Sequence, residues 1–143
     1  MKTHISLPAS NLQRSVDFYQ LLLDMQPTKH FSDYALFVSE DPGLELALNR
    51  GAASKSSRAS HFGIVVDSVE AVEAAIERLQ TAGLPIAVER EETCCYAKQT
   101  KLWASDPDDQ RWEIYYVHED TQNRNDPDMK CCSGDSGPAC CAA

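Results

Sequence analysis

Two small groups of residues in this chain have side chains suited to catalysis or metal binding. The first group contains His4, His61 and Glu113, and the second is the adjacent pair Cys94-Cys95. Two neutral imidazoles and one carboxylate on one surface form a facial triad, which suits divalent iron or manganese and leaves coordination positions open. Thiolates prefer soft elements. Taken singly, His4 is typical of a surface or turn histidine and Glu113 of a solvated strand residue, so the metal site depends on how the fold arranges them.

An internal repeat links the two histidines. The segment that begins at His4 resembles the segment that begins at His61, 57 residues later. Each reads as a short strand leading into an amphipathic helix, and each helix is followed by three strand-like runs. The sequence therefore predicts an α+β fold of two βαβββ modules that form a cupped mixed β-sheet, at about residues 3–50 and 60–118.

The predicted elements have recognisable ends. The first helix is expected to begin at Ser10 or Asn11, where Ser10 and Gln13 form a capping-box pattern. The second is expected to begin near Asp67 or Ser68 and to end before Gly83. The predicted strands after the helices are Thr28–Phe31, Tyr34–Ser39, Leu44–Asn49, Ile86–Glu91, Lys98–Ala104 and Arg111–Val117.

Strand alternation separates the polar candidates from the apolar residues. In the strand that begins with His61, Phe62 and Ile64 face the opposite side, and in the last strand Trp112 and Ile114 oppose Glu113. The apolar set is free to pack under a helix while the other set lines a cup. Glu45 mirrors Glu113 in the first module and is either a fourth ligand or a trace of the repeat.

Composition excludes several classes of protein. The net charge of −9 makes nucleic acid an unlikely partner, because a phosphate backbone would be repelled. The chain has no apolar run long enough for a membrane span and no signal-peptide pattern at its start, so the cytosol is expected. The six cysteines form three adjacent pairs, Cys94-Cys95, Cys131-Cys132 and Cys140-Cys141. A disulfide within such a pair would be strained, so free thiols are expected.

The domain is expected to end at residue 118. Residues 119–143 are rich in Asp, Asn, Gly, Ser, Pro and Cys and poor in apolar side chains, which predicts a disordered cysteine-rich tail. The tail thiols either scavenge a soft metal or play no part in turnover. Residues 51–60 form the predicted linker, which permits pairing of the modules within one chain or by exchange between two. The protein is therefore expected as a monomer or a homodimer.

Paired βαβββ modules with His, His and Glu at these places resemble the vicinal oxygen chelate superfamily, the glyoxalase and bleomycin-resistance fold, over about residues 3–118. The run Glu92–Trp103, with its Thr-Cys-Cys-Tyr centre, and the following Asp106-Pro107-Asp108 resemble more narrowly the C–As lyases grouped with the cadmium-induced proteins. That turn often reads Asp-Pro-Asp-Gly in the family, and Asp109 replaces the glycine here.

The resemblance implies a function and assigns roles. It implies an enzyme, dependent on Fe(II) and dioxygen, that removes the organic group from trivalent organoarsenicals such as methylarsonite and aromatic arsenicals and yields arsenite. His4, His61 and Glu113 would hold the iron, and Cys94 with Cys95 would bind the arsenic. The sequence leaves open which organic group is preferred.

Chelation by adjacent cysteines imposes a condition on the backbone. Successive residues of a regular strand point to opposite faces, so the two thiols cannot hold one atom there. We therefore predict a loop or turn at residues 92–97. Lys98 and Lys101 are candidates for assisting the thiols, although a solvated face is the simpler interpretation. Tyr96, Trp103 and Tyr115 are expected either to line the substrate pocket or to pack in the core.

Two other functions remain possible from the sequence. A thiol transferase of the fosfomycin-resistance type would use the same His, His, Glu site but would give the cysteine pair no role. A heavy-metal-binding protein without catalysis would bind Cd(II) or As(III) stoichiometrically on the cysteine pairs.

Overall fold

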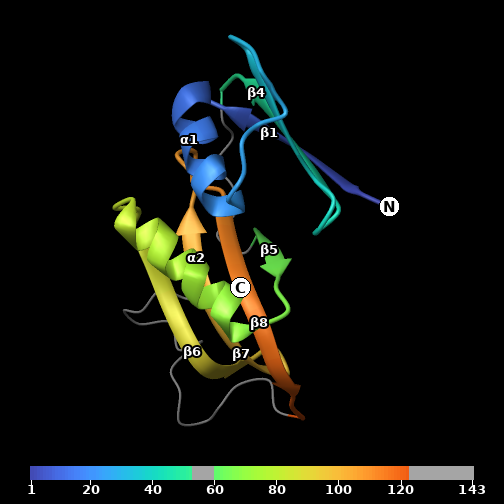
Figure 1. Ribbon diagram of the computed structural model, residues 1–143, viewed down its shortest axis with the longest axis vertical. Coiled ribbons are helices and arrows are strands. Elements are labelled where there is room, and N and C mark those ends of the chain that lie inside the picture. The colour runs from blue at the N-terminus through green and yellow to red at the C-terminus, as the bar shows by residue number, and fades with distance from the viewer. Residues whose placement is uncertain (53–59, 123–143) are drawn as a thin grey trace. The chain divides into compact units, whose positions relative to one another are not determined.

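The structure is a computed structural model of the whole chain, and it describes residues 1–52 and 60–122. Two modules of identical element order follow one another along the chain (Figure 1). The first contains β1 (Thr3–Ala9), α1 (Leu12–Leu23), β2 (Lys29–His30), β3 (Tyr34–Ser39) and β4 (Leu44–Arg50). The second contains β5 (His61–Val65), α2 (Val69–Thr81), β6 (Ile86–Cys94), β7 (Ala97–Ser105) and β8 (Arg111–Asp120). The predicted pair of βαβββ modules is confirmed.

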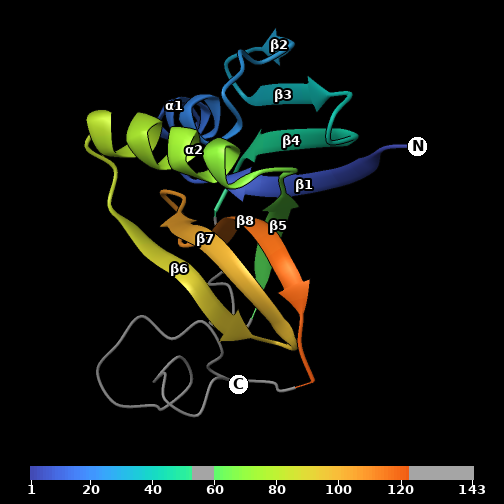
Figure 2. The same ribbon diagram turned by 60° about the horizontal axis from the view of Figure 1, so that its bottom comes forward.

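Each module has its own mixed four-stranded sheet. The strand order is β1-β4-β3-β2 in the first and β5-β8-β7-β6 in the second, and the first sheet is seen clearly in Figure 2. In both, the first strand of the module pairs in parallel with the last. The pairs β2–β3, β3–β4 and β6–β7 are antiparallel. The parallel pair therefore brings the two ends of each module together.

Both helices begin at a side-chain cap. Asn11 caps α1, since its side chain accepts a hydrogen bond from the Arg14 N–H, and Ser68 caps α2 in the same way through Ala71 N–H. The predicted capping box at Ser10 is wrong. The Ser10 backbone N–H donates instead to Asp108 Oδ2 at 2.9 Å, and its hydroxyl bonds the same carboxylate.

The helices cover their sheets with apolar faces at helical spacing. In the first module, α1 packs on β3 and β4, and the buried side chains include Val16, Tyr19, Leu22, Phe37 and Leu46. In the second, α2 packs on β8 and β6, and Val72, Ile76 and Leu79 are almost fully buried. The apolar spacing of the two helices predicts buried stripes through Leu12, Val16, Tyr19 and Leu23 and through Val69, Val72, Ile76 and Leu79. Six of these eight side chains are buried, whereas Leu23 and Val69 are half-buried and Leu22 is buried beside Leu23.

Contacts divide the chain into two units that do not quite follow the modules. The described part of the first unit comprises residues 1–52 and 105–110, and that of the second comprises 60–104 and 111–122. The turn between β7 and β8 belongs to the first unit because Tyr19 Oη donates to the buried Asp106 Oδ2 at 2.7 Å. Burial raises the pKa of Asp106, and the hydrogen bonds from Tyr19 and the backbone oppose that rise.

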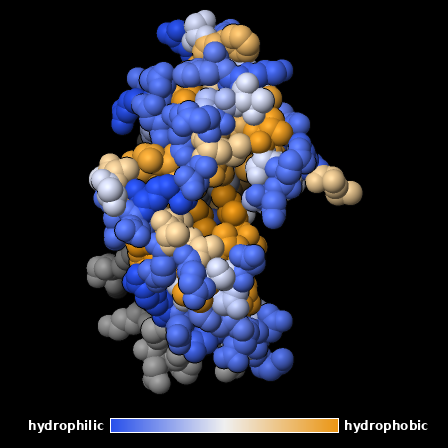
Figure 3. Space-filling view, viewed as in Figure 1, coloured by the Kyte–Doolittle hydropathy of each residue, from blue (hydrophilic) through white to orange (hydrophobic). Residues whose placement is uncertain are grey.

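Several strand ends differ from the prediction. β6 continues three residues beyond Glu91 to Cys94, and β8 continues to Asp120, so ordered structure passes the predicted boundary at residue 118. Most of the predicted linker and tail, including the four tail cysteines, lies outside the described residues. No helix in residues 1–52 and 60–122 is both long and apolar enough to cross a membrane. Figure 3 shows that hydrophilic side chains cover much of the face on view, with hydrophobic side chains gathered near its middle.

Candidate functional site

The β6–β7 hairpin positions the adjacent cysteines. Cys94 is the last residue of β6 and pairs with Ala97, so the turn contains only Cys95 and Tyr96. Both turn residues have positive φ, 54° for Cys95 and 68° for Tyr96, as in a type I′ turn. Side chains other than glycine, asparagine and aspartate rarely adopt this conformation. The backbone beside the cysteine pair therefore has a left-handed conformation that is uncommon for cysteine and tyrosine.

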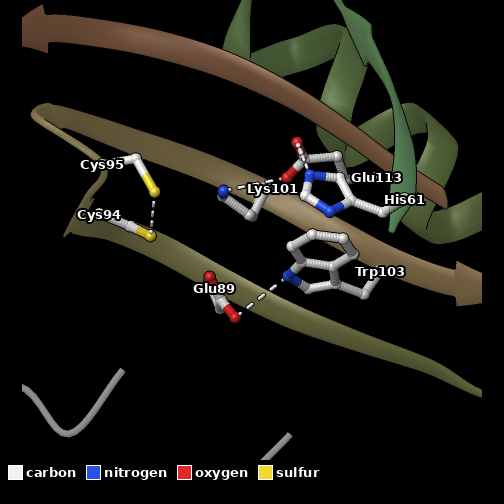
Figure 4. A network of polar contacts seen from close by, with 7 residues as sticks. All are labelled: His61, Glu89, Cys94, Cys95, Lys101, Trp103 and Glu113. Carbon is white, nitrogen blue, oxygen red and sulfur yellow. Dashed lines mark hydrogen bonds and ion pairs between the residues drawn. The ribbon is translucent and has the colours of Figure 1, made fainter. Parts of the chain in front are cut away.

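This turn brings the two thiols together. The Sγ atoms of Cys94 and Cys95 lie 3.4 Å apart, whereas neighbours in a continued strand would diverge (Figure 4). Cys94 is buried and Cys95 is exposed, and both are free thiols. The prediction that the chain must leave strand geometry is confirmed at Cys95. The predicted length of the turn, residues 92–97, is wrong, because residues 92–94 belong to β6, Ala97 begins β7, and only residues 95–96 form the turn.

A β-bulge in β6 sets the face on which Cys94 lies. Glu89 pairs with Lys101 and Glu92 with Gln99, so β6 has one residue more than β7 over this stretch. Glu91, in the bulge, has φ of 54°, and the Thr100 hydroxyl accepts its backbone N–H at 3.1 Å. Glu89 and Cys94 are five residues apart and would face opposite sides of a regular strand. The extra residue brings both to the face that carries Lys101.

The His61 and Glu113 side chains meet on the same sheet. Gly63 pairs with Glu113 across β5 and β8, and His61 lies two residues before Gly63. The His61 Nε2 atom is 3.5 Å from Glu113 Oε1. Gly63 leaves room for this approach, since a Cβ there would lie 3.2 Å from Glu113 Oε1 and 3.1 Å from Tyr115. The imidazole nitrogen of His61 and the buried carboxylate of Glu113 therefore lie close enough to serve as two metal donors.

Lys101 lies between the thiol pair and this His–Glu pair. Its Nζ donates to Glu113 Oε2 at 3.0 Å, and Figure 4 shows the ammonium directed toward the gap between Glu113 and the two cysteines. Burial opposes the charge of Lys101, but Glu113 and then Cys94 and Glu89 outweigh that effect, so the pKa of Lys101 is raised. Burial also raises the pKa of Tyr115, with Glu113 adding to the rise.

Trp103 forms the neighbouring wall. Its ring stands edge-on to His61 with 5.1 Å between centroids, and Arg111 lies over it at 4.5 Å. Its Nε1–H donates to Glu89 Oε1 at 3.2 Å, and Cys94 with Trp103 forms a small buried cluster. Trp103 thus lies against Cys94 of the thiol pair and His61 of the His–Glu pair. Glu89 is a buried carboxylate that sequence reasoning missed, because the bulge that turns it inward gives no sequence signal.

The other predicted site residues have different surroundings. Lys98 pairs with Thr93, on the face opposite Lys101, and lies 3.0 Å from the Glu91 carboxylate. We therefore remove it from the candidate substrate site. Tyr96 is about half exposed, at 52%, in the turn. Its carbonyl accepts the Thr121 N–H at 2.7 Å, which anchors the turn to the chain after β8.

His4 belongs to the first unit, where its Nδ1 lies 3.5 Å from Glu45 Oε2. In the part of the chain that the structure describes, no cluster of three or more His, Cys, Asp or Glu residues has the arrangement of a metal site. The His61–Glu113 pair nevertheless fits two donors of the predicted triad in chemistry and proximity.

Comparisons with known proteins agree with the fold and the motifs. A family profile described as the Glyoxalase/Bleomycin resistance protein/Dioxygenase superfamily matches residues 3–114. A trivalent organoarsenical cleaving enzyme of Bacillus sp. (strain MD1) is 37% identical over 130 residues, which cover 90% of this chain and 81% of that protein. The cadmium-induced protein CadI of Mycobacterium bovis is 35% identical over 121 residues, covering 85% and 79%.

Solved structures show the same fold at lower identity. A glyoxalase/bleomycin resistance protein/dioxygenase from Alicyclobacillus acidocaldarius matches with a TM-score of 0.67 and 18% identity, covering 83% of this chain and 92% of that one. The fosfomycin resistance protein FosX of Listeria monocytogenes, complexed with Mn(II) and sulfate, matches with a TM-score of 0.64 and 20% identity. The match covers 81% of this chain and 89% of that one. Members of this superfamily bind divalent metals. The chain belongs to the Glyoxalase/Bleomycin resistance protein/Dioxygenase superfamily, and its relatives at about 35% identity are named as organoarsenical cleaving enzymes and cadmium-induced proteins.

Proposed function

We propose that this protein is an iron- and dioxygen-dependent enzyme that cleaves the carbon–arsenic bond of trivalent organoarsenicals and yields arsenite. The observation that carries the proposal is the convergent thiol pair, with 3.4 Å between its Sγ atoms, on the sheet face that also holds His61 and Glu113. A trivalent arsenical offers two exchangeable oxygen ligands and one organic substituent. That substrate matches two adjacent thiols beside a metal-binding pair.

The thiols carry out the capture step without any cofactor. An organoarsenical in its hydrated form has two As–OH groups. Each thiol of Cys94 and Cys95 forms an As–S bond while one As–OH bond breaks, and the thiol proton leaves with the hydroxide as water. Two such exchanges release two waters and change no oxidation state. The arsenic is then fixed at the turn, with only its organic substituent left to react.

The metal centre would use His61 and Glu113 in the second unit and His4 as the third ligand. His61 and Glu113 fit the role because their donor atoms already approach one another at a buried carboxylate. His4 is included because it occupies the repeat position of His61. Divalent iron held by two imidazoles and a carboxylate would supply binding and activation of dioxygen.

The chain's own residues would orient the captured arsenical and limit water. Cys94 and Trp103 are 1% and 6% exposed, so one thiol lies against an apolar wall while Cys95 opens to solvent. The arsenical is therefore expected to enter at Cys95 and to become fixed at Cys94. Tyr96, at the turn, and Lys101, behind the thiols, are the proposed substrate-side neighbours. The substrates expected are methylarsonite and aromatic arsenicals.

The test is anaerobic loading with Fe(II), followed by methylarsonite and air, with released arsenite measured over time. Wild-type protein should release many equivalents. Cys94→Ser and Cys95→Ser should each abolish turnover while iron remains bound, and His61→Ala should lose iron. Lys98→Met is the matched control, because it changes the opposite face of the same hairpin. Equal activity of metal-free protein would show that the proposed function is wrong.

A second candidate is a protein that binds As(III) or Cd(II) without turnover. The thiol pair alone would suffice for it, and three relatives are named only as cadmium-induced proteins. The same assay separates the two, because a binding protein would release no arsenite beyond one equivalent. The likeness to FosX shows the fold alone, and a thiol transferase would leave the converged cysteines without a role.

A further inference from the structure

The two carboxylate oxygens of Glu113 have different neighbours. Oε1 lies 3.5 Å from His61 Nε2, and Oε2 accepts a hydrogen bond from Lys101 Nζ at 3.0 Å. The side chains of Lys101 and Glu113 are only 6% and 10% exposed, so water competes weakly for either oxygen. One oxygen of the Glu113 carboxylate thus faces the His61 imidazole, and the other is held by the Lys101 ammonium group.

The position of Lys101 is determined by more than Glu113. Its Nζ lies 5.3 Å from the Trp103 ring centroid and 5.6 Å from that of Tyr115, within the range of cation–π attraction. Glu89 pairs with Lys101 across the hairpin and holds Trp103 through its indole N–H. Since these partners surround the ammonium group, Lys101 cannot turn away from Oε2 without losing several contacts.

We propose that Lys101 is a positioning residue that retains Glu113 Oε2 and leaves only Oε1 to coordinate the metal. This inference rests on the metal centre of the proposed function and gives Lys101 a different role from contact with the arsenical. A carboxylate that binds through one oxygen occupies one coordination position, whereas one that binds through both occupies two. Lys101 therefore preserves an exchangeable position on the metal.

Removal of Lys101 has two separable consequences. The metal loses a nearby positive charge that opposes its binding, so affinity should rise by about tenfold or more at the effective dielectric constant of such sites. Oε2 also becomes available to the metal, so one exchangeable position is lost. Lys101→Met removes both the charge and the hydrogen bond. Lys101→Gln removes the charge and keeps an N–H donor for Oε2.

The experiment uses Mn(II) alone as the probe, added to the full-length protein without substrate. Free Mn(II) measured by electron paramagnetic resonance gives the affinity, and water-proton relaxation gives the number of exchangeable waters on the bound ion. Lys101→Met should bind Mn(II) about tenfold more tightly and hold one water fewer than wild type. Lys101→Gln should also bind more tightly but keep the wild-type water number, and Lys98→Met, on the other face, should match wild type in both.

A wild-type water number in folded Lys101→Met would overturn the proposal whatever its affinity. If Lys101→Met does not fold, Lys101→Leu keeps the test decisive, since it also removes both the charge and the hydrogen bond to Oε2, and a wild-type water number in folded Lys101→Leu would overturn the proposal. Failure of wild-type protein to bind Mn(II) would overturn the metal centre and this inference together. Normal Mn(II) binding with identical variants would overturn the inference alone.

Discussion

Each half of the chain contains a histidine–glutamate contact of 3.5 Å, and the two contacts have very different surroundings. In the first half, His4 and Glu45 have side chains that are 58% and 41% exposed. In the second, His61 and Glu113 are 36% and 10% exposed, and Lys101 bonds the carboxylate. An exposed pair is worth little because water screens it, whereas a buried carboxylate requires a partner. Burial and the added lysine distinguish the candidate site from its repeat.

The two glutamates are also not equivalent in register. His4 lies directly opposite Glu45 on the β1–β4 pair, but His61 lies opposite Arg111, and Glu113 is opposite Gly63. Glu45 therefore does not mirror Glu113, contrary to the interpretation of the sequence. The halves share a fold, but the second places its carboxylate two residues further along the strand, beside a glycine that admits it.

The sharpest way to test this comparison is to neutralise each glutamate in turn. Glu113→Gln should weaken Mn(II) or Fe(II) binding by about 100-fold or more, because a metal ligand is lost, and should destabilise the metal-free fold by about 3 kcal/mol, because Lys101 loses its buried counter-charge. Glu45→Gln should change each quantity by less than about 0.5 kcal/mol, as exposed sites do. Metal titration and urea unfolding measure both, and equal effects of the two variants would contradict the distinction.

The second prediction concerns pH and the lysine that only the second half possesses. The pKa of Lys101 is raised above its ordinary value of 10.5, so the folded state binds this proton more tightly than the unfolded state does. The stabilisation is complete below pH 10.5 and is lost as the pH rises through the folded-state pKa. The stability difference between wild type and Lys101→Met, about 3 kcal/mol near pH 8, should therefore shrink above about pH 10.5.

Urea unfolding of metal-free protein between pH 8 and 11 measures this difference. Lys98→Met is the control, because its exposed pair with Glu91 should give a small difference throughout this range. A difference between wild type and Lys101→Met that grows with pH would contradict the assigned sign.

A smaller effect is expected from the glycine beside Glu113. A Cβ at Gly63 would lie 3.1 Å from Tyr115 Cε1 and 3.2 Å from Glu113 Oε1, which is tighter than an ordinary contact. Gly63→Ala should therefore push the carboxylate from its place near His61 and weaken metal binding by about tenfold, equivalent to about 1.4 kcal/mol. Ser6→Ala, the corresponding position opposite Ala47 in the first half, should leave metal affinity unchanged. Metal titration of both variants checks the difference.

Much of this fold was accessible from the sequence because it depends on periodicity. The repeat of His4 at His61 and the amphipathic character of the helix in each half predicted the modules and the covered faces. Chelation geometry also predicted a break in the strand near Cys95. These features follow from local rules of spacing and side-chain direction.

The remaining features depend on register and on contacts distant in sequence. The bulge at Glu91 moves the side chains beyond it to the opposite face from the one that regular alternation predicts. The run Glu89–Glu92 contains no sequence signal for a bulge. Glu89 and Cys94 share one face of the sheet because of that extra residue. The opposite facing of Lys98 and Lys101 follows from ordinary alternation along β7, and the contact of Lys101 with Glu113 joins β7 to β8. Asp109, which replaces a glycine in the resembled motif, has a positive φ of 65°.

The smallest prediction compares the turns at Tyr96 and Asp109, both of which have positive φ at residues other than glycine. Replacing either by glycine should relieve about 1–2 kcal/mol of backbone cost, offset by about 0.5–1 kcal/mol of added freedom in the unfolded chain. Tyr96→Gly and Asp109→Gly should each stabilise the protein by about 0.5–1 kcal/mol in thermal or urea unfolding. The thiols should remain adjacent in Tyr96→Gly, because glycine adopts this turn readily.

Binding of the arsenical should separate the two variants. Tyr96 follows the thiol pair and is half exposed, so its ring is available to an aromatic substituent on the arsenic, whereas Asp109 lies in the first unit. Tyr96→Gly should weaken binding of a phenyl arsenical a few-fold, on the scale of one aromatic contact of about 0.5–1.5 kcal/mol, and leave methylarsonite unaffected. Asp109→Gly should change neither. Equal binding of the phenyl arsenical by all three proteins would remove Tyr96 from the substrate site and leave its role to the turn alone.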